Sequence, residues 1–233
     1  MINEEDHLRI QVLLPGLNFE KGWKLGNETD DFLESNLNFA FHEDFGYLTS
    51  CPTNVGTGLR VSAIVHIPSL VITGYINNFI YGLNKIGLTV RGIYGEGTKG
   101  IGDLYQISNQ ITLGEEEEKI IEKLKNVIYQ VITKERDLRD NLYSKRKNEM
   151  EDRVFRSLGL LKYSRIMSSM EAMKHISNVR LGMEMGIISN IDFKEITKLI
   201  IKTQPANIQR NANQELGKEE RDIKRAALIR ECI

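Results

Sequence analysis

The stretch LRVSAIVHIPSLVITGYINNFIYGL, residues 59–83, decides the fold because its hydrophobic period changes partway along it. Residues 59–67 alternate between polar and apolar, as a β-strand with one buried face does. From residue 72 to residue 83 the apolar positions follow a helical spacing, and Pro68 is well suited to the first position of a helix. The stretch therefore predicts a strand, a turn and a helix.

The same region needs to be distinguished from a membrane span, because residues 61–84 carry no formally charged side chain. The segment does contain His66, Pro68 and three asparagines. Its strand-like first part also shortens the apolar helix below the length that a bilayer requires. A strand–turn–helix unit of a soluble protein fits better, and we expect no membrane association.

Further elements are predicted on both sides of this stretch from the same two periods and from clusters of turn residues. Strands are expected at residues 2–12, 88–94 and 104–111, a helix at 18–42, and loops at 47–58 and 95–102. Gly87 is well placed just past the end of the helix that starts at Pro68.

The character of the sequence changes after residue 114. Residues 115–147 have the apolar spacing of one long amphipathic helix, and no strand-like alternation returns after it. We therefore predict two domains, residues 1–138 with mixed helices and strands and residues 139–233 with helices only, with an error of several residues at the boundary.

Composition excludes several classes of protein. The formal net charge is −1, with no long basic block, so neither nucleic acid nor an anionic membrane is an expected partner. The two cysteines, Cys51 and Cys232, are too few for a disulfide framework, and the histidines show no metal-ligand spacing with them. No signal peptide is recognisable, so we expect a cytoplasmic protein and no protein-bound metal site.

Three segments contain residues suited to chemistry. They are Asn-Glu-Glu-Asp-His-Leu-Arg at 3–9, Cys-Pro-Thr-Asn-Val-Gly-Thr-Gly-Leu-Arg at 51–60, and Arg-Gly-Ile-Tyr-Gly-Glu-Gly at 91–97. Taken singly, each has an ordinary explanation: a solvated acidic turn, a polar loop with an inert cysteine, and a surface ion pair. The three motifs are informative only in combination.

In combination and in this order, the three motifs resemble those of the phosphagen, or guanidino, kinase family. The resemblance covers residues 1–138. It implies an α+β domain, with an antiparallel sheet flanked by helices, that transfers phosphate from ATP to a guanidino group. Together with the helices that follow, the expected fold is such a catalytic domain followed by an all-α domain.

The resemblance assigns Glu5 and Glu96 as the two carboxylates that hold the acceptor guanidinium. Two carboxylates can bind its planar N–H groups in pairs, align one nitrogen with the γ-phosphorus and accept the departing proton. Cys51 matches the active-site cysteine beside the guanidinium, and we assign it a positioning and electrostatic role.

Arg9, Arg60 and Arg91 match arginines that bind the nucleotide phosphates in that family. Charge neutralisation is what phosphoryl transfer needs most, and Mg²⁺ bound through the phosphates would supply the rest. The predicted ATP-binding residues are Arg9, Arg60, Val61, Ser62, Ala63, Ile64, Arg91, Gly92, Ile93, Tyr94, Gly95 and Glu96.

Two departures narrow the resemblance. Small-molecule guanidino kinases usually have Glu-His-Thr where this chain has Glu-Gly-Thr at 96–98, and they end soon after the long helix. Here a helical extension contains Arg-Asp-Ile-Lys-Arg-Ala at 221–226, and residues 107–114 read Ile-Ser-Asn-Gln-Ile-Thr-Leu-Gly. These features resemble the bacterial protein-arginine kinases of the McsB type, in which the extension dimerises. By that resemblance an allosteric phosphoarginine pocket is formed by Arg221, Asp222, Ile223, Lys224, Arg225 and Ala226.

The resemblance implies ATP-dependent phosphorylation of exposed arginines in proteins, linked to protein quality control and the stress response. The implied partners are a second copy of the chain, a zinc-finger activator of the McsA type, a Clp unfoldase or protease and a heat-shock repressor. Two alternatives stay open: a small-molecule guanidino kinase of the arginine or creatine type, and a non-catalytic dimerising module that binds phosphoarginine.

The family also has a helical N-terminal region and a Ser-Ser-Arg-Ile-Arg phosphate-binding motif before the first of these motifs. This sequence contains neither. Because part of the phosphate-binding machinery is then missing, we expect residues 1–233 by themselves to be inactive or nearly so.

Overall fold

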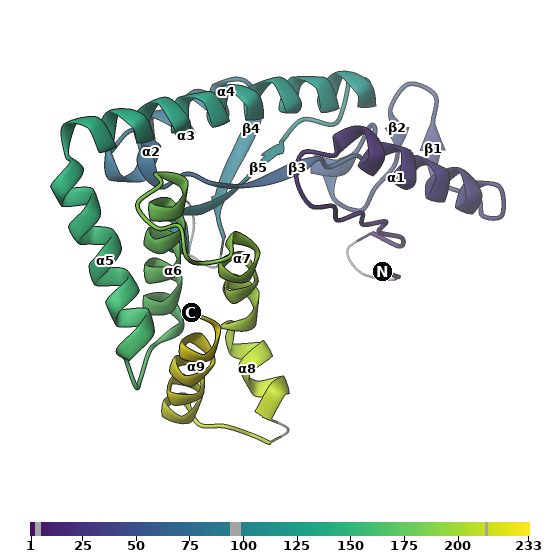
Figure 1. The fold of residues 1–233 in the computed structure, drawn as a ribbon. Helices are drawn as coiled ribbons and strands as arrows, with labels where there is room; N and C mark the ends of the chain where they lie inside the picture. Colours follow the sequence, from purple (N-terminus) through teal and green to yellow (C-terminus); the bar gives the residue numbers. More distant parts are fainter. Residues whose placement is uncertain (3–5, 94–98, 213) are drawn as a thin grey trace. The chain divides into compact units, whose positions relative to one another are not determined.

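The structure is a computed structural model that describes residues 1–233 except 3–5, 94–98 and 213 (Figure 1). Contacts divide the chain into two compact units. The first contains residues 1–64, 77–90 and 106–132, and the second contains residues 65–76, 91–105 and 133–233. The predicted domain boundary near Leu138 stays a prediction.

A three-stranded sheet has the order β3-β5-β4. Its strands are β3 (Ser62–His66), β4 (Leu88–Gly92) and β5 (Leu104–Asn109). Asn109 N–H donates to Val61 O at one end of the β3–β5 pair (3.3 Å), and Ile67 N–H donates to Asp103 O at the other (3.0 Å), so the two strands are antiparallel. β4 and β5 are antiparallel by the same argument, from bonds between Ile93 and Leu104 and between Gln110 and Gly87. The predicted fold class, an antiparallel sheet with helices, is confirmed.

Residues 59–83 form the predicted strand, turn and helix, with one difference. Pro68 starts α2 (Pro68–Ile72), but Gly74, at φ +77°, interrupts the helix before α3 (Ile76–Lys85). Gly87 follows at φ +76° and ends α3 before β4, because glycine adopts this left-handed conformation without steric cost.

The predicted strand at residues 2–12 is wrong over the residues that the structure describes, which are 2 and 6–12. Ile2 and Leu8 form a single antiparallel bridge, Arg9 N–H donates to Met1 O (3.0 Å), and residues 9–14 form no strand. The alternating pattern is present, but a strand also needs a neighbour to accept its hydrogen bonds. Within the described part of this chain, the segment pairs only with itself.

The rest of the N-terminal region is built from short elements. The predicted helix at 18–42 is confirmed only over α1 (Phe19–Glu34). A small antiparallel pair follows, β1 (Phe41–His42) with β2 (Gly46–Tyr47), and then the 3₁₀ turn η1 (Pro52–Asn54).

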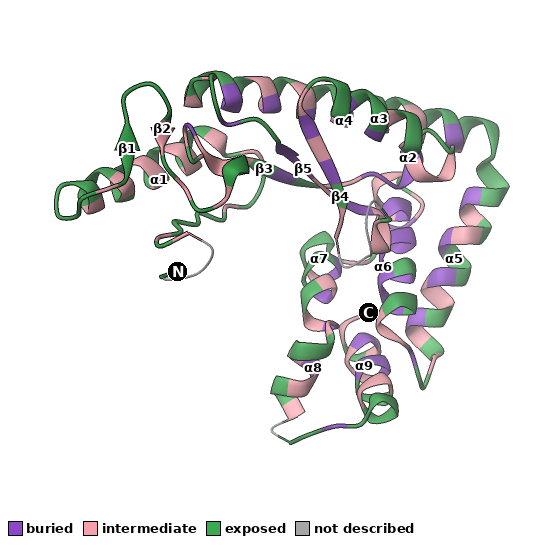
Figure 2. Cartoon of the chain, turned by 180° about the vertical axis from the view of Figure 1, so that it is seen from behind, coloured by how far each residue is buried: buried purple, intermediate pink, exposed green. Residues whose placement is uncertain are grey.

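The long predicted helix is α4 (Glu117–Lys145), and every element described after it is a helix. These are α5 (Lys147–Tyr163), α6 (Ser169–Glu184), α7 (Phe193–Lys202), α8 (Pro205–Ala212) and α9 (Lys218–Cys232). α5 and α6 pack side by side, and the purple residues of Figure 2 follow their shared face. The core there is formed by Val154, Leu161, Met167, Ala172, Ile176, Val179, Ile188, Ile196, Leu199, Ala226 and Ile229.

A buried carboxylate joins α4 to α2. Glu135 is 5% exposed and accepts from the backbone N–H groups of Ser69 (2.8 Å) and Leu70 (2.9 Å) at the start of α2. Those N–H groups have no partner within their own helix, so Glu135 supplies it from a distant part of the sequence. Burial raises the pKa of Glu135, although the two backbone hydrogen bonds act in the opposite direction.

Over the described residues, no helix combines the length and the apolar character that crossing a membrane requires.

Candidate active site

The loop of the second motif contains the predicted active-site cysteine. Cys51 is half-buried and precedes η1, and its Sγ lies 2.9 Å from Thr53 Oγ1. The thiol therefore has a hydroxyl partner within its own turn.

Asp6 joins the first motif to the second. Its Oδ1 accepts from the backbone N–H of Ser50 (2.7 Å) and its Oδ2 accepts from Asn54 Nδ2 (3.0 Å). The residue that follows Glu5 in sequence is thus bound to both sides of Cys51. The sequence places Asp6 within the first motif but gives no signal for this role, because its partners are 44 and 48 positions away.

Thr112 supports the same loop from the opposite side. Its hydroxyl donates to Thr53 O (3.0 Å) and Val55 O (2.7 Å), and its carbonyl accepts from Thr57 N–H (3.1 Å). Between these residues Gly56 has φ +110°, and a Cβ there would lie 2.3 Å from Thr112 O. The second motif therefore needs glycine at this position for both conformation and space.

Asn109 fixes the end of the motif to β5. Its Oδ1 accepts from Val61 N–H (2.8 Å), and its Nδ2 donates to Leu59 O (3.0 Å) and Ile111 O (3.1 Å). Asn109 is 6% exposed, so all three bonds are shielded from water. Thr112 and Asn109 both belong to the run at 107–114, which the structure shows to be a support for the loop.

Arg60 lies between this loop and β3. Its Nη2 donates to Ser108 Oγ (3.2 Å), while the residue as a whole is exposed. Ser62 and Ile64 follow on the same exposed face, and Gln106 Nε2 donates to Ser62 Oγ (2.9 Å). Ala63 points to the buried face and Val61 is half-buried. In residues 60–64, which are predicted to bind ATP, every second residue is therefore accessible.

The other predicted arginines are exposed as well. Arg9 follows the bridge between Ile2 and Leu8, and Arg91 lies on β4. Gly92, after Arg91, lies so close to Lys99 that an added Cβ would be 2.2 Å from its carbonyl oxygen. Arg9, Arg60 and Arg91 are thus all surface residues of the described chain.

Glu5, Glu96, Tyr94 and Gly95 lie outside the described residues. The pairing of Glu5 with Glu96 therefore stays a prediction. What the structure describes is how their chain neighbours are held. Asp6 is bound to the cysteine loop, and Ile101 N–H donates to Ile93 O (3.1 Å) across the base of the third motif.

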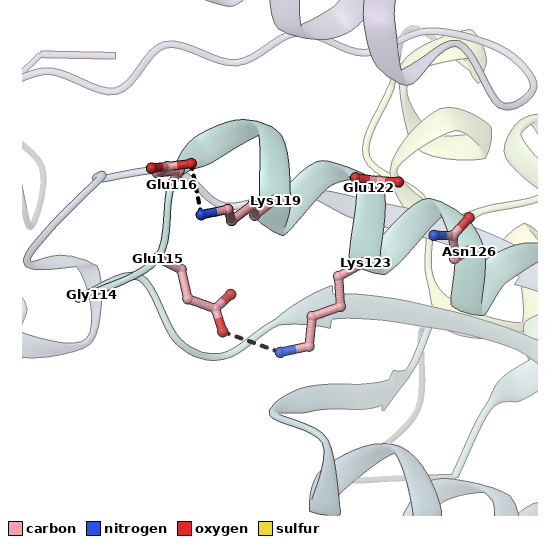
Figure 3. A pocket seen from close by; sticks show the side chains of 7 residues that line it. All are labelled: Gly114, Glu115, Glu116, Lys119, Glu122, Lys123 and Asn126. Atoms are coloured by element: carbon pink, nitrogen blue, oxygen red, sulfur yellow. Dashed lines mark hydrogen bonds and ion pairs between the residues drawn. The ribbon is translucent and has the colours of Figure 1, made fainter.

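A polar hollow of about 440 Å³ lies at the start of α4 (Figure 3). Lys123 Nζ reaches Glu115 Oε1 (3.3 Å), and Lys119 Nζ reaches Glu116 Oε2 (3.0 Å). The lining residues are Gly114, Glu115, Glu116, Lys119, Glu122, Lys123 and Asn126. Gly114 is the last residue of the 107–114 run, and none of the three motifs contributes to the lining, so this hollow is not the candidate active site.

The residues of α9 that are predicted to bind phosphoarginine differ sharply from one another in burial. Arg225 is 1% exposed, with Nε donating to Thr203 O (2.7 Å) and Nη1 to Met167 O (2.9 Å) and Asp222 Oδ1 (2.5 Å). Arg221 is half-buried and donates to Leu216 O (3.0 Å).

The remaining residues of that segment divide in the same way. Asp222 is half-buried, Ile223 and Lys224 are exposed, and Ala226 is buried. A ligand can therefore approach Arg221, Asp222 and Lys224, whereas Arg225 is in contact with the interior of the helical region.

Two family models match the sequence. "ATP:guanido phosphotransferase, C-terminal catalytic domain" matches residues 1–138, and "Protein-arginine kinase McsB C-terminal domain" matches residues 147–233.

Curated relatives match along the whole chain. The protein-arginine kinase of Pelotomaculum thermopropionicum is 53% identical over 230 residues, which are 99% of this chain and 65% of that relative. The protein-arginine kinase of Geobacillus sp. is 53% identical over 100% of this chain and 64% of its own length, and that of Clostridium novyi is 52% identical over 100% and 68%. This chain thus spans roughly two thirds of the length of these relatives.

A solved structure, the duplicated taurocyamine kinase from Schistosoma mansoni with bound transition state analog components, has a similar fold. The TM-score is 0.51 with 33% sequence identity, over 57% of this chain and 18% of that one.

Proposed function

Because the chain belongs to the ATP:guanido phosphotransferase family, and within it to the protein-arginine kinases, we propose that it is the larger part of an enzyme that phosphorylates arginine side chains of proteins. The observation that carries the proposal is the pairing of a guanido phosphotransferase domain with the helical domain of protein-arginine kinases in one chain.

The proposed reaction uses the three motifs together. A guanidino nitrogen of the acceptor attacks the γ-phosphorus of ATP, the bond to the bridging oxygen breaks, and ADP leaves. Glu5 and Glu96 hold the guanidinium, and one of them takes its proton. Cys51 lies in a loop bound to Asp6, the neighbour of Glu5, which supports placing the thiol near the acceptor.

The nucleotide is proposed to bind through Arg9, Arg60 and Arg91. The alternating exposure of Arg60, Ser62 and Ile64 supports this role, because it leaves one face of this segment open to a ligand. Mg²⁺ would be held mainly by the nucleotide phosphates and would neutralise charge on the transferring group.

Acceptor choice tests the reaction. The chain, completed with the part of a relative that it lacks, is incubated with Mg·ATP and either a protein or free arginine, and phosphoarginine is measured by mass spectrometry. The proposal expects the protein to be modified, and Glu5→Gln or Glu96→Gln to remove most product while ATP still binds. Modification of free arginine alone would instead favour the small-molecule kinase, and near-normal turnover by either variant would remove the carboxylate assignment.

We also propose a phosphoarginine sensor on α9 that is separate from the catalytic residues. Arg221 and Lys224 are accessible cations, and Asp222 can accept from guanidino N–H groups. The test is calorimetric titration of phosphoarginine, with free arginine as the competing ligand. Arg221→Ala should weaken binding, whereas Lys218→Ala on the same helix should not; equal binding by both variants would contradict the sensor.

The wider setting is proposed on the same basis. Proteins with exposed arginines are the acceptors, a second copy of the chain binds through the helical domain, and the protein acts in the cytoplasm. The link to protein quality control through a McsA-type activator, a Clp protease and a heat-shock repressor is part of this proposal and is testable by co-purification.

A further inference from the structure

A buried polar network joins the sheet to helix α6. His66 Nε2 lies 2.9 Å from Ser177 Oγ, and Ser177 Oγ donates to Asp103 Oδ2 at 2.6 Å. The His66 side chain is 2% exposed and Ser177 is 3% exposed. His66 is the last residue of β3, and Asp103 immediately precedes β5. One hydroxyl of the helical region therefore holds the adjacent ends of two strands.

The backbone around Asp103 has little freedom to rearrange. Asp103 has φ +54° and Gly102 has φ +64°, and a Cβ on Gly102 would lie 3.0 Å from Met173 O of α6. Ile67 N–H donates to Asp103 O (3.0 Å), so Asp103 is bound by its backbone to the residue that follows β3 and by its side chain to α6. A left-handed aspartate costs energy that these contacts must offset.

The hydrogen-bond donors can be assigned. Because the Ser177 hydroxyl donates to Asp103, its oxygen accepts from N–H at His66 Nε2. Nδ1 of His66 then faces Glu184 Oε1 at 3.9 Å without a hydrogen bond. Glu184 is itself bound by Arg139 (2.5 Å) and Arg180 (3.3 Å), so α4 and α6 both contribute to the network.

A second set of contacts runs from α6 toward the residues that are proposed to bind phosphoarginine. Gln204 Nε2 donates to Met173 Sδ (3.2 Å), and the preceding carbonyl, Thr203 O, accepts from Arg225 Nε (2.7 Å). Packed side chains and hydrogen bonds thus connect α9, through the end of α7 and through α6, to the ends of β3 and β5. Such a connection can transmit a change only if it biases the geometry of the strands, which is measurable.

We infer that Ser177 is a positioning residue through which helix α6 sets the nucleotide affinity of strand β3. The inference rests on the proposed ATP-binding role of Arg60–Ile64. His66 is the last residue of β3, which contains Ser62, Ala63 and Ile64 and directly follows Arg60 and Val61. Ser177 is the hydrogen-bond partner of His66 from another part of the fold. Loss of the hydroxyl leaves the buried side chain of His66 and the half-buried Asp103 with one hydrogen-bond partner fewer each, and β3 loses its fixed end.

The chain offers a matched control in Ser157 of α5. Ser157 is also 3% exposed and also bridges a histidine and a second side chain, with His175 Nδ1 at 3.1 Å and Asn178 Nδ2 at 2.9 Å. All three residues lie on α5 and α6, so this network touches no strand. Ser157→Ala and Ser177→Ala should therefore lower stability alike and differ only in their effect on the sheet.

The experiment measures the Kd of Mg·ATP by calorimetry and the urea midpoint of unfolding for the whole chain and both variants. Ser177→Ala should raise the Kd about fivefold or more, in the range of typical coupling between sites, while Ser157→Ala leaves it within about twofold. Asp103→Asn keeps a hydrogen-bond acceptor for Ser177, and asparagine tolerates the positive φ. The Kd of Mg·ATP for this variant should therefore lie between the values of the wild type and Ser177→Ala. Equal Kd values for the two serine variants would overturn the inference.

Failure of the proposed function has a different signature. If the wild-type chain binds no Mg·ATP, the nucleotide role of this chain fails, and hydrogen exchange then decides the inference. Faster exchange of the Ile67 amide in Ser177→Ala but not in Ser157→Ala would support the positioning role; unchanged exchange in both would overturn it.

Discussion

The N-terminal 62 residues and the helices from α5 to α9 are stabilised by different interactions. Among the described residues of 1–62, no apolar side chain is buried, and α1 contributes none to a core. α6, in contrast, buries apolar side chains on successive turns, among them Ala172, Ile176 and Val179 at 0% exposure. Burial of apolar area is the dominant favourable term in folding, so the helical region has its own source of stability.

Polar contacts hold the first region instead. Asp6 binds Ser50 and Asn54, Tyr47 donates to Asp30 (3.0 Å), and Lys125 of α4 forms an ion pair with Glu20. A hydrogen bond of this kind contributes only about 1 kcal/mol, and a fully exposed ion pair contributes little because water and salt screen it. The comparison teaches that the first two predicted catalytic motifs, at residues 3–9 and 51–60, lie in a region without a buried apolar core, so local opening there is expected to cost little free energy. The geometry of these two motifs then depends on individual hydrogen bonds.

The largest expected effect tests the core of the helical region. Ile176→Ala removes most of a fully buried side chain and should lower the free energy of unfolding by about 4 kcal/mol. Phe32→Ala, at a residue 69% exposed on α1, should change it by less than about 0.5 kcal/mol. Urea unfolding followed by circular dichroism measures both. Similar losses would show that the two regions do not differ as described.

A somewhat smaller loss is expected from the buried arginine. Arg225→Ala leaves Thr203 O and Met167 O without their donor and should cost about 3 kcal/mol. Lys224→Ala, at the exposed neighbouring position, should be nearly neutral. An Arg225→Ala protein as stable as the wild type would show that these buried hydrogen bonds do not stabilise the helical region.

In the N-terminal 62 residues, the loss of one polar contact should affect only the residues nearby. Asp6→Ala removes both bonds to the cysteine loop, and the Ser50 amide should exchange faster by an amount equivalent to about 1–2 kcal/mol. Asp44→Ala, at an exposed carboxylate beside β1, serves as the control. If Ser50 exchange is unchanged, packing rather than Asp6 holds the loop.

The smallest effect concerns pH. Burial lowers the pKa of His66, with Glu184 partly opposing it, and burial also lowers the pKa of His175. As the pH drops from 7.5 to 5.5, these histidines become protonated in the unfolded chain while they stay largely neutral in the folded chain. The free energy of unfolding should therefore fall over this range. The slope per histidine cannot exceed about 1.4 kcal/mol per pH unit.

His66→Gln should flatten this dependence, leaving the part that belongs to His175. Denaturant titrations at several pH values measure the slope. A slope identical to that of the wild type would show that His66 does not titrate differently in the two states.

The hydrophobic periodicity of the sequence was sufficient to predict most of the helices and strands. β3, β4, β5, α4 and the helical C-terminal region follow from periods of two and 3.6 residues, since those periods report which face a segment buries. The same reasoning failed for residues 2–12, because alternation does not supply a neighbouring strand. The family motifs assigned Glu5, Glu96 and the arginines from sequence alone, and the pairing of the two carboxylates stays a prediction.

Only the tertiary structure decided which polar groups meet. The bonds from Asp6 to Ser50 and Asn54 join residues 44 and 48 positions apart, and those of Ser177 to Asp103 and His66 span 74 and 111. The helical period places Arg221 and Arg225 on one face, yet the structure buries Arg225 and leaves Arg221 accessible. Periodicity describes one segment at a time, whereas burial and hydrogen bonding depend on what the rest of the chain packs against it.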